Sequence, residues 1–159
     1  MSELRIDVAD LLTHPGSRRD VALAAELDAL RGASAAITGP VQVRASLERV
    51  SDGIVVRGNV SARWRAQCSN CLQQVERELT VHVDELFEPS PVEGETYPLE
   101  GHELDLEQLV RDALLLELPL APRCDRTCVA ADASRPVGDI VDDDGPRDPR
   151  WAPLAELEL

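Results

Sequence analysis

Four cysteines are the residues of this chain whose type and spacing are best suited to chemistry. They fall into two pairs, Cys68-Ser-Asn-Cys71 and Cys124-Asp-Arg-Thr-Cys128. Two thiols close together at a turn supply half of a tetrahedral metal site. On one helical turn the side chains of residues i and i+4 share a face, so the second pair can converge as well. We therefore expect Cys68, Cys71, Cys124 and Cys128 to hold a structural zinc ion.

Two other states of these cysteines stay open, reduced thiols without a metal and a reversible disulfide. The first residues lack the basic and then apolar regions of a signal peptide, and no run of eighteen apolar residues suggests a membrane span. These features predict a cytoplasmic protein without membrane contact, and in that compartment paired cysteines favour metal over disulfide. A thiol oxidoreductase would carry CxxC at a helix N-terminus within a βαβ unit, so a redox protein is the least favoured function.

Strand-like runs flank the first cysteine pair. Val60, Ala62 and Trp64 alternate with polar residues before it, and apolar residues alternate in the same way from Val75 to Val83. With Ser69 and Asn70 as a two-residue turn, Cys68 lies opposite Cys71, Trp64 opposite Val75 and Arg63 opposite Glu76.

A second hairpin precedes this one. Asp52-Gly53 is a strong turn dipeptide, and it places Leu47 opposite Gly58. The two hairpins share a middle strand and agree in phase, which predicts a three-stranded antiparallel meander over residues 41–83. Its outer face would carry the arginines Arg57, Arg63 and Arg65, while Val56, Val60 and Trp64 face the core.

Helical patterns occur on both sides of the meander. Residues 105–118 carry an apolar stripe that ends before Pro119, and residues 18–30 also suggest a helix. Leu4, Ile6 and Val8 indicate a short first strand. The fold class expected is α+β: an antiparallel β-meander packed against one main amphipathic helix, with an irregular acidic C-terminal segment.

The charge of the chain divides it in two. Residues 1–83 hold ten acidic residues and ten arginines, whereas residues 84–159 hold twenty acidic residues and six arginines and carry the whole net charge of −14. Such a surface repels phosphate backbones and attracts basic proteins. We expect a single domain over residues 1–128, including the CxxC hairpin and the CxxxC arm. Residues 129–159 are expected to form an acidic, partly disordered tail with a short apolar docking segment at its end.

The order of these motifs resembles the YceD-type family, a domain linked to the accumulation of large-subunit ribosomal RNA. The resemblance covers most of the chain. It rests on Cys68-Ser-Asn-Cys-Leu72, Phe87-Glu-Pro89, the helix that ends in Leu118-Pro-Leu-Ala-Pro122, the Cys124/Cys128 arm and the terminal Asp148-Pro-Arg-Trp-Ala-Pro-Leu154. Many members of that family carry a further Cys-Pro-x-Cys-Gly segment, whereas residues 129–138 of this chain contain no cysteine.

The resemblance implies a non-enzymatic factor of ribosome biogenesis, and the sequence shows no phosphate loop, catalytic triad or HExxH motif. We expect a basic large-subunit ribosomal protein or assembly intermediate as the partner, bound through Asp142, Asp143, Asp144 and Trp151. Contact with RNA would then be indirect or weak. The alternative is a direct RNA-binding module that uses Arg57, Arg63 and Arg65.

Overall fold

The computed structural model describes residues 3–28 and 30–124, all of which belong to the first of two compact units of the chain, Met1–Cys128. The expected division at residue 128 and the expected properties of residues 129–159 lie outside the described residues and stay predictions. Within the described ranges, neither helix is long and apolar enough to cross a membrane.

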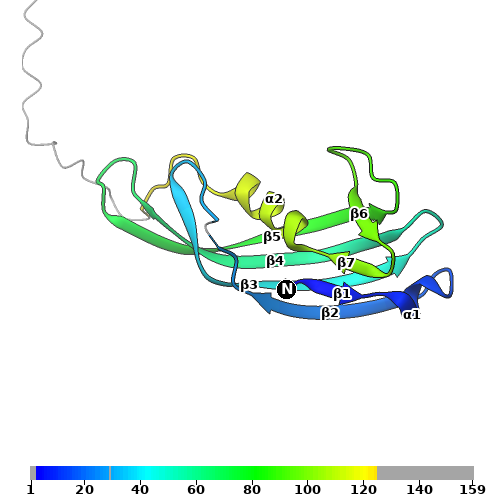
Figure 1. The fold of residues 1–159 in the computed structure, drawn as a ribbon. Helices are drawn as coiled ribbons and strands as arrows, with labels where there is room; N and C mark the ends of the chain where they lie inside the picture. The colour runs from blue at the N-terminus through cyan, green and yellow to red at the C-terminus, as the bar shows by residue number, and fades with distance from the viewer. Residues whose placement is uncertain (1–2, 29, 125–159) are drawn as a thin grey trace, which may run out of the picture. The chain divides into compact units, whose positions relative to one another are not determined.

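One seven-stranded sheet dominates these residues, in the order β1-β7-β6-β5-β4-β3-β2. Its strands are β1 (Arg5–Asp7), β2 (Arg18–Ala25), β3 (Ala35–Arg49), β4 (Ile54–Gln67), β5 (Gln74–Glu88), β6 (Tyr97–Glu100) and β7 (Glu103–Asp105). The helices are α1 (Ala9–Leu12) and α2 (Glu107–Glu117). Neighbouring strands run antiparallel except for β5 and β6, which are parallel. The long strands curl, and α2 lies on one face of the sheet over β4 and β5 (Figure 1).

The expected architecture, a meander packed against one main helix, is wrong. The meander of residues 41–83 exists within β3, β4 and β5, but it is the middle of a larger curled and mixed sheet. Strands β6 and β7 are four and three residues long, too short for an alternating pattern to be recognised in the sequence. The described part of the chain is therefore mostly β, with two short helices.

The helix expected over residues 18–30 is also wrong, because most of this segment forms strand β2. Its alanines and leucines suit a helix by intrinsic propensity. In the structure, however, all eight residues of β2 pair with β3, from Arg18 opposite Glu48 to Ala25 opposite Val41. A paired, half-buried strand position outweighs a weak local preference of this kind.

Both hairpin registers differ from the expected ones by two residues. Leu47 lies opposite Val56 rather than Gly58, and Trp64 lies opposite Arg77 rather than Val75. The loops are longer than the two-residue turns that the sequence suggested. Because side chains alternate with a period of two, a shift of two residues leaves every side chain on its expected face.

The core lies between the inner face of the sheet and α2. Buried Val56 and Val60 belong to one hydrophobic cluster with Leu109, Val110 and Leu114 of α2, so the expected helix over residues 105–118 packs on the expected face. A second, smaller cluster joins Trp64, Cys68 and Leu118. Trp64 is only 6% exposed. This smaller cluster forms the base of the cysteine site.

Candidate functional site

Three of the four cysteines come together in the structure. The sulfur of Cys124 lies 3.8 Å from that of Cys68 and 3.7 Å from that of Cys71, and all three sulfurs lie within 4.8 Å of one another. Four thiolates bound tetrahedrally at about 2.3 Å from a metal ion are roughly 3.8 Å apart, whereas a disulfide bond is only about 2.05 Å long. The spacing of the three sulfurs is therefore that of metal ligands rather than that of a disulfide. Cys128, the fourth expected ligand, lies outside the described residues.

A six-residue loop between β4 and β5 positions the first two thiols. The N–H of Cys68 donates to the carbonyl of Gln73 at 2.8 Å, and the N–H of Leu72 donates to the carbonyl of Cys68 at 3.0 Å. These two bonds fold the loop tightly around the CxxC sequence. Cys68 becomes fully buried and Cys71 half-buried, so both thiols are shielded on one side by the protein.

The arm that carries Cys124 follows α2 and is held against this loop. The N–H of Ser69 donates to the carbonyl of Pro122, and Nη2 of Arg77 donates to the carbonyl of Arg123, both at 2.8 Å. One signal of this contact is present in the sequence, since Arg77 is a charged residue in the apolar phase of its strand. With buried Leu118 packed in the cluster of Trp64, the arm is fixed by contacts besides those of the thiols.

Leu72, the residue after the second cysteine, has a backbone φ of 61°. No other non-glycine residue in the described ranges has a positive φ. The left-handed region costs an L-residue such as leucine about 1–2 kcal/mol, and its side chain is 66% exposed, so packing does not offset this cost. Strain of this kind persists where the surroundings impose a particular geometry, and here it accompanies the turn that brings Cys68 and Cys71 together.

We expect Leu72→Asn to raise the free energy of unfolding by about 0.5–1 kcal/mol, because asparagine tolerates the left-handed region better than leucine does. Urea denaturation of purified protein measures the change. Leu72→Ala is the matched control, since it removes the same exposed side chain but keeps the backbone strain, and it should give no gain. Equal stability of the two variants would contradict the assignment of strain.

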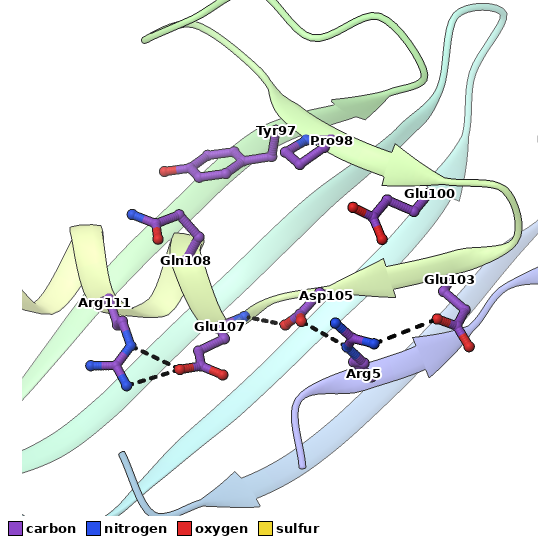
Figure 2. Close-up of a pocket in the computed structure, with 9 residues that line it drawn as sticks. All are labelled: Arg5, Tyr97, Pro98, Glu100, Glu103, Asp105, Glu107, Gln108 and Arg111. Carbon is purple, nitrogen blue, oxygen red and sulfur yellow. Dashed lines mark hydrogen bonds and ion pairs between the residues drawn. The ribbon is translucent and has the colours of Figure 1, made fainter. Parts of the chain in front are cut away.

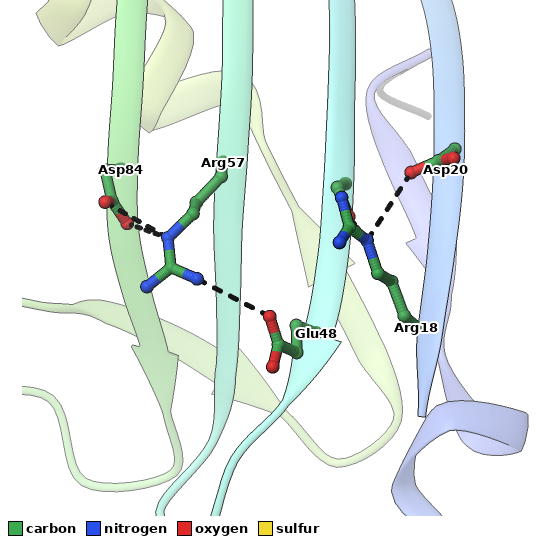
Figure 3. A network of polar contacts seen from close by, with 6 residues as sticks. Arg18, Asp20, Glu48, Arg57 and Asp84 are labelled. Carbon is green, nitrogen blue, oxygen red and sulfur yellow. Dashed lines mark hydrogen bonds and ion pairs between the residues drawn. The ribbon is translucent and has the colours of Figure 1, made fainter. Parts of the chain in front are cut away.

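The arginines proposed for RNA binding do share one face of the sheet. Arg57, Arg63 and Arg65 point away from α2 and are exposed. Arg57 is held between Asp84 at 3.0 Å and Glu48 at 3.5 Å (Figure 3), and Arg65 pairs with Glu76 at 2.6 Å. On this outer face five arginines lie among five carboxylates: Arg18, Arg44, Arg57, Arg63, Arg65, Asp20, Glu48, Glu76, Glu78 and Asp84. The face therefore carries no net positive charge.

The part of the molecule formed by β1, β6, β7 and α2 is rich in acidic residues and contains a small cavity of about 270 Å³ (Figure 2). Arg5 on β1 pairs with Asp105 at 2.9 Å and with Glu103 at 3.8 Å, and the hydrogen bond from Arg5 to Asp105 raises the pKa of Arg5. On α2, Arg111 pairs with Glu107 at 2.8 Å. Both cations of this cavity are thus paired with carboxylates of the protein. Arg5 links β1 to β7, whereas the pair of Arg111 and Glu107 lies within α2.

The residues expected to bind the partner, Asp142, Asp143, Asp144 and Trp151, lie outside the described residues. Their role stays a prediction. The sequence did not indicate the left-handed backbone of Leu72, for which neither residue type nor periodicity gives a signal.

Comparison with known proteins places this arrangement in a family. A family model described as large ribosomal RNA subunit accumulation protein YceD matches residues 56–158. An uncharacterized protein of Mycobacterium tuberculosis is 34% identical over 122 residues, which cover 70% of this chain and 58% of the relative. An uncharacterized protein of Mycobacterium leprae is 31% identical over 129 residues, 74% of this chain and 59% of the relative.

The chain thus spans less than two thirds of the length of these relatives. No solved structure matches it. The family match begins in β4 and includes all four cysteines together with α2. With the family model covering more than half of the chain, and its cysteine hairpin, helix and arm in that order, the chain belongs to the YceD family.

Proposed function

We propose that this protein supports the accumulation of large-subunit ribosomal RNA as a non-enzymatic assembly factor. Its mode of action would be binding of a basic large-subunit ribosomal protein, or an assembly intermediate that exposes one. The family description supports the first part of this proposal. The second part rests on the distribution of charge over the folded chain.

The charge split is the observation that carries the choice of partner. Residues 3–83 hold ten carboxylates and ten arginines, whereas residues 84–124 hold eleven carboxylates and only two arginines. The second group includes β6, β7 and α2. Complementary charge of this kind speeds the encounter with a basic protein and disfavours anionic partners.

Direct RNA binding through the outer face is the competing function, and the structure gives it little support. A phosphate-binding surface needs cations that are free to replace counterions. Arg57 and Arg65 are engaged by carboxylates of neighbouring strands. RNA contact is therefore indirect or weak in this proposal.

Zinc is the metal that we propose for the thiol site, with Cys128 as the fourth ligand. Thiolate ligands in tetrahedral geometry favour zinc, which has no redox chemistry of its own. Its role would be structural, because it would lock the arm after α2 onto the hairpin between β4 and β5. A thiol redox function is less well supported, since the CxxC pair lies in a strand-to-strand loop rather than at a helix N-terminus.

The proposal can be tested by measuring association and dissociation rates against two immobilised partners, a purified basic large-subunit ribosomal protein and a naked ribosomal RNA fragment. Neutralising the acidic run with Asp142→Asn, Asp143→Asn and Asp144→Asn should slow association with the basic protein more than it speeds dissociation. Binding should also weaken with salt, because exposed charges are screened beyond about 10 Å at ~0.1 M.

The matched variant replaces Arg57, Arg63 and Arg65 by serine on the outer face. It should leave binding of the basic protein unchanged. Binding of naked RNA at physiological salt that depends on these arginines, together with no binding of the basic protein, would overturn the proposal in favour of the RNA-binding module.

A further inference from the structure

A larger groove lies beside the salt-bridged cavity, on the same side of the sheet as α2. Its volume is about 850 Å³. It is bounded by Glu85 on β5, the connection of residues 91–96, the start of β6 and one side of α2.

The floor of this groove is apolar and unusually exposed. Leu115 and Leu116 of α2 are 39% and 87% exposed. Beside them lies Tyr97, whose ring stacks on buried Phe87 with the ring centroids 5.2 Å apart and whose hydroxyl donates to Asp112. Since Leu116 is almost wholly in solvent, it contributes little to the stability of the fold. Its surface is available to a partner.

The rim of the groove is acidic, and its charges are not neutralised. Glu85, Glu93, Glu95 and Asp112 line it, together with no arginine, lysine or histidine. None of these four carboxylates forms an ion pair within the described part of the chain, in contrast to Asp84, Glu48 and Glu76 on the outer face. Burial, together with the charges of Asp112 and Glu85, raises the pKa of Tyr97 to about 12, as expected where negative potential accumulates.

We propose that this groove is the docking site for a basic segment of a partner protein that also carries leucine-sized apolar side chains. The ammonium or guanidinium groups of the segment would meet the four carboxylates, and its apolar side chains would cover Leu115 and Leu116. The proposal rests on the proposed function and makes it more specific, since it adds one groove of the described residues to the acidic surface that would contact the partner. The carboxylates of this rim would repel the phosphates of a nucleic acid. They would also repel the same groove of a second copy of the chain, which carries the same carboxylates.

The test uses the full chain and two synthetic dodecapeptides, measured by calorimetry at low and at high salt. One peptide consists of lysine and arginine with two leucines, and in the other the leucines are serines. We expect Leu116→Ser to weaken binding of the leucine peptide by about tenfold, the loss expected when a buried apolar side chain contact is removed. It should have little effect on the serine peptide. Leu120→Ser is the control, because Leu120 is 80% exposed and lies outside the groove.

Charge is tested separately. Glu93→Gln with Glu95→Gln should weaken both peptides by about tenfold at low salt and reduce the salt dependence of binding. Glu26→Gln with Glu78→Gln makes the same change in net charge at exposed positions outside the groove, and it should have a smaller effect. All four substituted side chains are exposed, so a folding defect is not expected to explain a loss of binding.

The outcomes separate this proposal from the function on which it rests. Equal affinity of Leu116→Ser and Leu120→Ser for the leucine peptide, or an RNA fragment bound in a Leu116-dependent way, would overturn the groove as a basic-peptide site. If the basic ribosomal protein binds the wild-type chain and the groove variants equally, the groove proposal fails and the proposed function stands. If the peptides behave as expected but the ribosomal protein does not bind, the groove stands and the proposed function fails.

Discussion

Protein purified under reducing conditions is expected to carry one zinc ion per chain, and its removal is expected to lower the midpoint of thermal unfolding by roughly 10 °C or more. Three thiols already lie at ligand distances around one point, so the metal would add its binding free energy to a preformed site. Without it, the arm that carries Cys124 loses the link through the metal, although its hydrogen bonds with Ser69 and Arg77 and the packing of Leu118 remain. Elemental analysis gives the zinc content, and calorimetric scans with and without a chelator give the shift.

Cys124→Ser provides the control for this experiment. It removes one ligand from a half-buried position, so the variant should hold little zinc and should melt at the same temperature with and without the chelator. A wild-type protein that contains no zinc and is unaffected by the chelator would leave reduced thiols as the state of the site. A mass lower by about 2 Da than that of the reduced chain would instead indicate the disulfide.

Gly58→Ala is expected to lower the free energy of unfolding by about 3 kcal/mol, at the upper end of the range for overpacking substitutions. Gly58 lies in β4 opposite Ala45 of β3. A Cβ atom at this position would stand 2.5 Å from the Cα of Ala45 and closer still to the carbonyl oxygen of Arg44. Because both are backbone groups, the clash cannot be relieved by a change of rotamer, and β3 and β4 must move apart.

Gly32→Ala is the matched control for this substitution. The nearest atom to a Cβ at Gly32 is a side-chain carbon of Leu118 at 3.4 Å, which is ordinary contact, so the variant should be nearly as stable as the wild type. Urea denaturation with both variants measures the difference. A loss for Gly58→Ala no greater than that for Gly32→Ala would show that the two strands are not as close at this point as the structure has them.

The sequence predicted the parts of this fold that depend on pattern alone. Alternation around Trp64 and the apolar stripe of α2 identified the meander, its inner face and the helix that covers it. The predicted faces were correct although both hairpin registers were wrong, because a shift of two residues along a strand leaves each side chain on the same face. The convergence of Cys68, Cys71 and Cys124 was predictable for a different reason. The cysteines come in two pairs, and the prolines after the helix put the second pair on an extended arm that can reach the hairpin.

Other parts of the fold depend on pairing partners that a local pattern does not contain. Strand β2 has a helix-like composition and becomes a strand only because β3 offers it eight partners. Strands β6 and β7 are too short to show a period, and they join the sheet through the parallel pairing of Phe87 with Tyr97. The groove beside α2 was not foreseen either, since it requires the connection of residues 91–96 to be placed against Leu115 and Leu116.

The pairing of the first strand with the last has a consequence for the order in which the chain folds. Arg5 of β1 lies opposite Asp105 of β7, across a loop of about a hundred residues, whereas β2 to β5 pair with their neighbours in the sequence. During synthesis the local hairpins can close as they emerge, but β1 must wait until β7 has left the ribosome, and closing so long a loop slows folding. The pairing of β1 with β7 is therefore completed last, only after most of the described chain has been made.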